Sequence, residues 1–399
     1  MKKLAYVLKS SAFLYNIYYY LMSVLLKVWG FFIKTDEKLI LFNSYGGKKI
    51  DDSPKAIYLA MKKDKRFRDY HLIWAVQNPD EWDCIDGLKC IKSDTLKYFY
   101  TALKAKVWIT NSSMERGLDF KKKNTICLNT WHGTAIKKMG IDIQSDNQSF
   151  RSKNNVRADI MLAQSQYDID IFSHAFELPI ERFHCIGLPR NDVLANYTKE
   201  DVRDIKEKLG ISQHKKVLLY APTFREYTKG KDKEVILEIP MKLAYWQKKL
   251  GQEYVVLFRA HYEVAKHMEV TGFPMFMDVS AYPVLNELMI VSDALISDYS
   301  SIYFDYSVMH KPMYCFAYDY EGYMSNRGMY LDLKKELPCE MHKTEESLLS
   351  DILNMEQDYE EKCRKTIAFQ KRFVTEYGNA AKKSCDILHE VLSKKRKFK

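Results

Sequence analysis

The sequence predicts an α/β protein built from two doubly wound domains. Short apolar runs alternate with amphipathic segments in two successive series, and such alternation is typical of parallel β-α-β units. The length of 399 residues also exceeds that at which one hydrophobic core usually keeps growing. A hydrophobic content of 47% beside 29% charged residues is globular composition. We therefore expect two Rossmann-like halves of ordinary domain size.

Each half supplies its own strands. The first half predicts strands at 38–44, 71–76, 106–112 and 125–133, and helices at 53–64 and 95–105. The second half predicts strands at 215–223, 254–261, 275–280, 294–301 and 312–319. The expected division is a membrane-associating segment 1–34, an N-terminal domain 35–205, a C-terminal domain 206–385 and a basic tail 386–399.

The stretch Phe13 to Ile33 is rich in Tyr, Trp and Leu but contains Asn16, Ser23 and Lys27. It lacks the short apolar core and small-residue cleavage site of a secretory signal. Aromatic residues favour the headgroup level of a membrane, and a central lysine is costly in hydrocarbon. The favoured interpretation is an amphipathic helix lying on the membrane surface. A single membrane span and a helix packed on the protein's own core are the alternatives.

The formal charge of +10 suits an anionic partner such as nucleic acid, acidic lipid or a polyanionic substrate. A merely solubilising charge is the simpler alternative. The eight cysteines are scattered, without a pair at metal-ligand spacing, which favours reduced thiols in a cytosolic protein. We expect no metal site and no nucleic-acid partner.

Polar residues gather where predicted parallel strands end, which is where such sheets bind ligands. In the first half, His132 lies at the end of the strand predicted at 125–133 and precedes Gly133 and Thr134. Its near-neutral pKa suits a general base for a hydroxyl group. A helix at Ala135 to Lys138 is expected to place the imidazole beside its anion-binding amino terminus. A histidine bonded within a turn is the alternative.

The second half carries three further clusters at strand ends. Hydroxyl groups and backbone N–H groups at a helix start bind phosphate, although simple helix capping is the alternative. An arginine beside a histidine suits a pyrophosphate, although burial of the arginine against an acid such as Asp278 is possible. The candidates are Ser297, Asp298, Ser300 and Ser301, then Arg259 and His261, then Thr223 and Arg225.

Two familiar phosphate-binding loops, GxxxxGK[ST] and GxGxxG, are missing from the sequence, which argues against a P-loop enzyme or a dinucleotide oxidoreductase. Helix termini, arginine and histidine are then expected to carry the phosphate charge. No tightly bound cofactor is expected, although a loosely held divalent cation is compatible with this chemistry.

Several segments together resemble the CDP-glycerol glycerophosphotransferase family of Gram-positive bacteria, which builds teichoic acids and related capsule polymers. They are NTWHGTAIKKMG, GLPRND, YAPTFRE, FRAHY and the long block from Ser292 to Asp332. The resemblance implies a GT-B-like architecture, with two domains facing a cleft and CDP-glycerol or CDP-ribitol held mainly by the second. It also implies a lipid-linked polymer acceptor and peripheral attachment to the cytoplasmic face of the membrane.

The resemblance further implies residue roles. His132 would deprotonate the acceptor hydroxyl, and Arg259 with His261 would contact the donor diphosphate, His261 handling the leaving CMP. The hydroxyl attacks the alcohol-bearing phosphorus, a reaction in which positioning and charge stabilisation dominate. Ser300, Ser301, Thr223 and Arg225 would hold phosphate or cytidine, and Arg190 and Asp192 would orient the acceptor or brace the domain junction.

Two alternatives remain open at this point. A GT-B glycosyltransferase would use a nucleotide sugar on a similar fold. A non-catalytic, membrane-bound binding protein would explain the charge and the aromatic residues without any reaction. The sequence does not distinguish glycerol from ribitol, or a primase from a polymerase.

Overall fold

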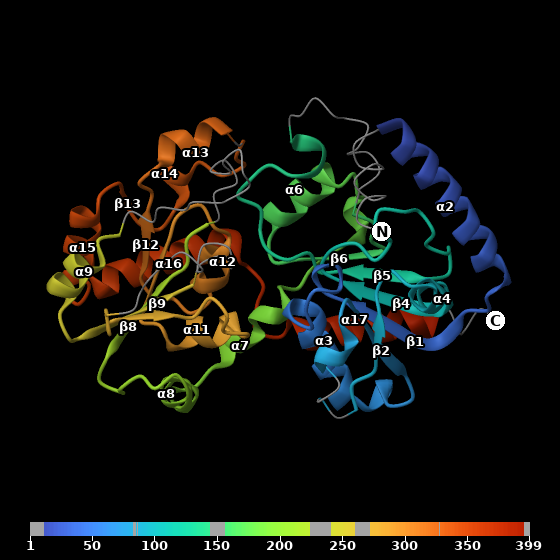
Figure 1. Cartoon of the computed structure of the whole chain (residues 1–399), viewed down its shortest axis with the longest axis horizontal. Coiled ribbons are helices and arrows are strands. Elements are labelled where there is room, and N and C mark those ends of the chain that lie inside the picture. Colours follow the sequence, from blue (N-terminus) through green and yellow to red (C-terminus); the bar gives the residue numbers. More distant parts are fainter. Residues whose placement is uncertain are drawn as a thin grey trace. The chain divides into compact units, whose positions relative to one another are not determined.

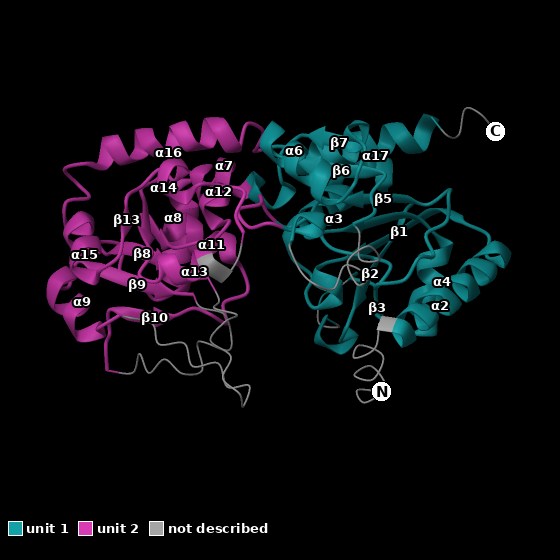
Figure 2. Ribbon diagram, turned by 90° about the horizontal axis from the view of Figure 1, so that it is seen from above, with its two compact units in different colours: residues 1–132, 139–192, 379–399 teal, residues 133–138, 193–378 magenta. Residues whose placement is uncertain are grey.

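The computed structural model describes residues 12–82, 85, 87–143, 156–223, 241–259, 272–326 and 328–394. The chain forms two compact units (Figure 2). Unit 1 comprises residues 1–132, 139–192 and 379–399, and unit 2 comprises residues 133–138 and 193–378. The chain therefore passes from unit 1 into unit 2 directly after His132.

Unit 1 is built on a parallel sheet that has seven strands within its described residues, in the order β3-β2-β1-β4-β5-β6-β7. Its central strands are buried along almost their whole length, because helices cover both faces of a doubly wound sheet. The strands are β1 (Asp36–Asn43), β2 (His71–Val76), β3 (Cys90–Lys92), β4 (Ala105–Thr110), β5 (Ile126–Asn129), β6 (Ile160–Ala163) and β7 (Phe183–Cys185).

Helices from both ends of the chain cover this sheet (Figure 1). They are α2 (Ala12–Phe32), α3 (Asp52–Lys63), α4 (Leu96–Lys104), α6 (Gln166–Ala175) and α17 (Ala380–Lys394). Cys385, Leu388 and Leu392 of α17 join the core formed by β1, β2 and α3. Residues 386–394, which were expected in a basic tail, thus belong to a helix on the core of unit 1.

Unit 2 contains a parallel sheet with six strands among its described residues, in the order β10-β9-β8-β11-β12-β13. The strands are β8 (Lys216–Tyr220), β9 (Tyr254–Phe258), β10 (Phe276–Asp278), β11 (Ala294–Ser297), β12 (Met313–Phe316) and β13 (Met341–His342). The helices are α7 (Asp192–Asn196), α8 (Lys199–Lys208), α9 (Leu243–Leu250), α11 (Leu285–Val291), α12 (Ile302–Ser307), α13 (Tyr320–Asn326), α14 (Leu333–Glu336), α15 (Glu345–Leu353) and α16 (Tyr359–Phe373).

Unit 2 takes up the chain again at residue 193, before the expected boundary at 206, and includes helix α8. This helix packs against α11, and its Lys208 forms a 2.7 Å ion pair with Glu287. The helix therefore packs on unit 2 through a face that includes the buried Ile205.

Both sheets reverse their strand order at an equivalent position, which confirms the predicted doubly wound topology. In unit 1 the reversal lies between β1 and β4, and in unit 2 between β8 and β11. Ligands of such sheets bind outside the carboxyl ends of the strands at this switch point. Ligand-binding groups are therefore expected in the loops after β1, β4, β8 and β11.

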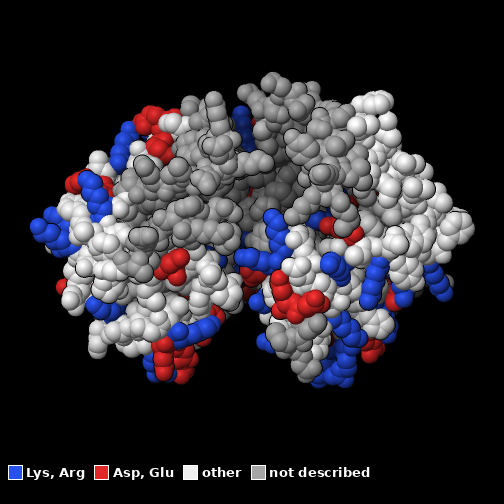
Figure 3. Space-filling model, viewed as in Figure 1, with Lys and Arg blue, Asp and Glu red and all other residues white. Residues whose placement is uncertain are grey.

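Helix α2 packs on unit 1 through one face and exposes the other. Leu26 and Ser23 are buried, and the Ser23 hydroxyl accepts a hydrogen bond from the Asp119 N–H. Phe31 and Phe32 are 85% and 78% exposed. The surface over α2 is accordingly almost free of charged side chains (Figure 3). Among the helices of the described residues, none has the length and apolarity required to span a membrane.

Candidate active site

His132 lies just beyond β5, in a backbone turn that the surrounding structure holds under strain. Trp131 has a φ of 48°, which is unusual for a residue other than glycine. Its N–H donates to the Asn129 side chain, and its ring packs 4.1 Å from the imidazole and 4.6 Å from Phe176. Strained backbone of this kind persists where neighbouring contacts over-determine it, and it is concentrated at functional sites.

The imidazole of His132 has a defined tautomer in its neutral form. Its Nδ1 lies 2.8 Å from the Asn111 carbonyl oxygen, which only accepts hydrogen bonds, so Nδ1 carries the proton. Nε2 is then left with a lone pair. The residue keeps a solvent-exposed edge, yet burial of the ring lowers its pKa, against opposing effects of the Asn111 bond and of Asp52. At neutral pH the imidazole of His132 is therefore uncharged, and it can act as a base through Nε2.

A buried ion pair braces the backbone of His132 from the other side. The Arg190 guanidinium donates to the Asp52 carboxylate at 2.9 Å and to the His132 carbonyl oxygen at 2.8 Å. Asp52 also accepts from the Tyr45 hydroxyl and the Ser53 N–H. Burial alone would raise the pKa of Asp52, but Arg190 and these donors hold it below the ordinary value. The carboxylate is therefore charged.

The same loops are tied across the switch point of unit 1. The Tyr45 N–H after β1 donates to the Asn111 side chain after β4 at 2.8 Å, and the Gly46 N–H lies 3.2 Å from the Ser112 hydroxyl. Asn111 thus links the loop of Tyr45 to the imidazole of His132. His132 thus lies at the end of a strand, is uncharged at neutral pH and is held in place by the neighbouring loops. A histidine of this kind is suited to abstract a proton.

The structure corrects the prediction of a helix at residues 135–138. This segment is irregular, and Lys137 forms an antiparallel bridge with Met329. The Lys138 N–H donates to the Gly328 carbonyl, and the Tyr330 N–H donates to the Ile136 carbonyl. Those long-range partners outcompete a local helix, so no helix begins at Ala135 to place its amino terminus beside His132. Gly133 has a φ of 146°, and Thr134 is buried.

Asp192 caps a helix. Its carboxylate accepts hydrogen bonds from the Ala380 and Ala381 N–H groups, both at 2.8 Å. These groups open α17 and otherwise have no partner within their own helix. Of the two residues taken from the GLPRND segment, Arg190 joins the His132 network and Asp192 supports α17.

In unit 2, Asp298 organises the loops at the switch point. Its carboxylate accepts from the Thr223 N–H at 2.9 Å and from the Thr223 hydroxyl at 2.6 Å, which joins the ends of β8 and β11. The Ser297 hydroxyl donates to the Ala221 carbonyl at 2.7 Å. Thr223, Ser297 and Asp298 are therefore brought together, and these bonds shape the loops.

The remaining candidate residues of unit 2 differ in their hydrogen-bond partners. Ser300 accepts a 3.3 Å bond from the Ile302 N–H at the start of α12, whereas Ser301 makes no side-chain cap bond. Arg259 follows β9 and donates hydrogen bonds to the backbone carbonyl oxygens of Val279 and Tyr282. The acid considered as its partner from the sequence was Asp278. Arg225 and His261 lie outside the described residues. No group of three metal-ligating side chains occurs within the described ranges.

Sequence reasoning did not identify Tyr45, Asp52, Asn111 or Trp131 as site residues. Tyr45 and Asn111 had a usable signal, because Tyr45 directly follows the strand predicted at 38–44 and Asn111 lies at the end of the strand predicted at 106–112. Asp52 had none, since an acid before Ser53 and Pro54 looks like an ordinary helix start. Its φ of 62° and its contact with Arg190 appear only in the folded chain.

Comparison with solved structures shows the class of fold to which the protein belongs. The chain superimposes on the wall teichoic acid polymerase TagF with a TM-score of 0.84 and 31% identity, over 90% of both chains. A UDP-GlcNAc 2-epimerase from Neisseria meningitidis, at 12% identity and a TM-score of 0.51, shares the fold alone. The protein is thus an α/β protein with parallel sheets, similar to GT-B proteins.

The family follows from sequence comparison. Residues 26–390 match the model of CDP-glycerol:poly(glycerophosphate) glycerophosphotransferases, and the chain belongs to this family. It is 32% identical to a teichoic acid poly(glycerol phosphate) polymerase of Bacillus spizizenii, with 90% of this chain and 94% of the relative covered. A Staphylococcus epidermidis polymerase of the same description is 33% identical over 88% of this chain, which spans half of that relative.

Proposed function

We propose that this protein transfers glycerol phosphate or ribitol phosphate from a CDP-alcohol to a hydroxyl group of a lipid-linked or polymeric acceptor, releasing CMP, in teichoic acid or capsule synthesis. The observation that carries the proposal is His132, whose Nδ1 is fixed by the Asn111 carbonyl and whose pKa is lowered by burial. The family membership supports the donor class, and a TagF variant has been soaked with CDPG.

In this mechanism Nε2 of His132 takes the proton of the acceptor hydroxyl. The oxygen attacks the alcohol-bearing phosphorus, a new P–O bond forms, and the bond to CMP breaks. Arg190 holds the His132 backbone through its carbonyl oxygen while Asp52 balances the guanidinium charge. Both act by positioning the base, which is the larger part of catalysis in phosphoryl transfer.

The donor is assigned to unit 2. Arg259 with His261 and Arg225 would face the diphosphate, and Ser300 and Ser301 would donate to phosphate or cytidine. Thr223, Ser297 and Asp298 would hold the loops that present these groups, as their mutual hydrogen bonds suggest. Gly133 and Thr134 would line the acceptor side. A loosely held divalent cation would neutralise donor charge without a dedicated set of ligands.

The acceptor is lipid-linked in this proposal, so the protein would work at a membrane. The exposed apolar face of α2 and the formal charge of +10 suit a peripheral position on an anionic surface. The cytoplasmic face is where a CDP-alcohol would be supplied.

The direct experiment incubates purified protein with a defined lipid-linked acceptor and CDP-glycerol, CDP-ribitol or a UDP-sugar. CMP release matched by an equal gain of alcohol phosphate on the acceptor is the expected result with a CDP-alcohol. Product mass then distinguishes glycerol from ribitol and one added unit from many. Parallel reactions with EDTA test the divalent cation. Release of UDP or UMP with sugar transfer would overturn the proposal.

A further inference from the structure

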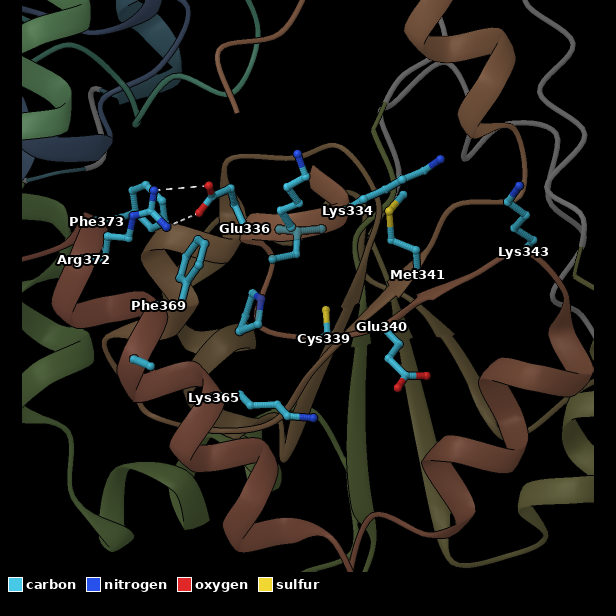
Figure 4. Close-up of a pocket in the computed structure, with 14 residues that line it drawn as sticks. Lys334, Glu336, Cys339, Glu340, Met341, Lys343, Lys365, Phe369, Arg372 and Phe373 are labelled. Carbon is cyan, nitrogen blue, oxygen red and sulfur yellow. Dashed lines mark hydrogen bonds and ion pairs between the residues drawn. The ribbon is translucent and has the colours of Figure 1, made fainter. Parts of the chain in front are cut away.

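Unit 2 contains a pocket of about 730 Å³ that the proposed chemistry does not use (Figure 4). It lies beside β13, the last strand of the sheet. Within the described residues, β13 pairs with a strand, β12, along one of its two edges. Its lining comes from α14, from both sides of β13 and from α16. It is therefore a built surface formed by three segments.

The lining of the pocket is strongly basic. It contains five lysine or arginine side chains and two glutamates, so positive charges outnumber negative ones by three. One end is closed by Arg372, which pairs with both carboxylate oxygens of Glu336. In Figure 4 the ammonium groups of Lys334 and Lys365 lie on opposite sides of Cys339 and Glu340. This distribution of charge suits an extended anion that contacts several cations at once.

The cations of the pocket are held loosely. Lys343 pairs with Glu321 at 2.6 Å and Lys365 with Glu361 at 3.0 Å, and all four side chains are at least half exposed. Such surface pairs contribute little net free energy. A phosphate group can therefore replace either carboxylate at low cost.

The lining of the pocket also contains apolar side chains, among them Leu337, Phe369 and Phe373. A lining with both cationic and apolar side chains suits a ligand in which short carbon segments alternate with phosphates. Free phosphate would use the cations alone.

Two tyrosine rings connect the pocket to the loops of the proposed donor site. The Lys334 ammonium lies 4.6 Å from the centre of the Tyr320 ring, which is 6.3 Å from the Tyr299 ring. The Tyr299 N–H donates to the Asp298 carboxylate. The pocket is thus joined to the switch point of unit 2 by side chains in contact.

We propose that this pocket binds a stretch of the alcohol-phosphate polymer away from its reacting end. The inference rests on the proposed function, because it takes the growing phosphodiester chain as the ligand. A chain long enough to reach the pocket would then be held more tightly than a short acceptor, while the binding of the CDP-alcohol would be unaffected.

The test compares a triple variant, Lys334→Gln with Lys343→Gln and Lys365→Gln, with a matched control. The control, Lys248→Gln with Lys249→Gln and Lys371→Gln, removes the same charge from exposed positions of unit 2 outside the pocket. Fluorescence anisotropy measures binding of labelled poly(glycerol phosphate) by the full chain over a range of salt concentrations. The KM for a one-unit acceptor and for CDP-glycerol is measured in parallel.

The pocket variant should bind the polymer about tenfold more weakly or worse and show a shallower salt dependence, whereas the control and both KM values should stay near wild type. Equal losses in pocket variant and control, or unchanged polymer binding, would overturn the inference. So would unchanged polymer binding with lost binding to phosphatidylglycerol vesicles, which would indicate a lipid surface. Binding needs no turnover, so missing CMP release would contradict the proposed function alone.

Discussion

The imidazole of His132 combines a fixed proton with a free lone pair. Its pKa lies below the ordinary value of about 6.5 because burial disfavours the charged ring. A base must be neutral to act, so kcat/KM should fall as the pH drops through this lowered pKa. Asp52 stabilises the protonated ring, and Arg190 opposes it.

The Asp52→Asn substitution tests this electrostatic arrangement. Removing the negative charge leaves Arg190 unopposed, so the pKa of His132 should fall further and the acidic limb of the profile should move to lower pH. Profiles of kcat/KM for the variant and for Asp69→Asn, an exposed carboxylate paired with Lys38, check the prediction. A shift of the Asp52→Asn limb to higher pH would contradict it.

At the scale of elements, Asp192 distinguishes a structural role from a substrate role. Its carboxylate caps α17, and loss of a cap costs about 0.5–2 kcal/mol. Asp192→Ala should therefore lower the free energy of unfolding by about 1 kcal/mol, while Asp192→Asn retains most of it. Urea denaturation measures both. The KM for the acceptor should stay unchanged, and a raised KM in both variants at unchanged stability would indicate substrate contact.

Helix α2 carries the membrane part of the proposal. Leu21, Val24 and Val28 are each more than half exposed. Their joint replacement by glutamine should lower the affinity for phosphatidylglycerol vesicles, measured by cosedimentation, by roughly 100-fold, since each side chain loses apolar burial in the interface.

A matched control for α2 replaces three exposed apolar residues elsewhere, Ile180, Val193 and Leu353, with glutamine. This control should sediment with vesicles as the wild type does. Equal binding by both triple variants and the wild type would show that α2 does not hold the protein at the membrane.

Elements with a strong local pattern were predictable from sequence. The strand expected at 71–76 forms β2 over the same residues, and the helix expected at 95–105 forms α4 with Thr95 as its cap. The helix expected after His132 failed because Lys137 pairs with Met329, a partner almost half the chain away. Local propensity carries no information about such a partner.

At the scale of the whole molecule, the alternation of strands and helices was enough to predict two doubly wound sheets. The strand-end positions of His132, Thr223 and Asp298 followed from it. The return of α17 to unit 1 did not, because it depends on Asp192 and on core contacts of Leu388 with a sheet formed hundreds of residues earlier. Asp52 was missed for the same reason.

The central claim is that His132 is the base of a CDP-alcohol phosphotransferase. The most direct measurement is the turnover of CDP-glycerol or CDP-ribitol by His132→Ala, beside His174→Ala, an exposed histidine of the same unit. A lost general base predicts a decrease of about 10²- to 10⁴-fold in kcat for the first variant and near-normal turnover for the second. Near-normal CMP release by a folded His132→Ala variant would contradict the claim.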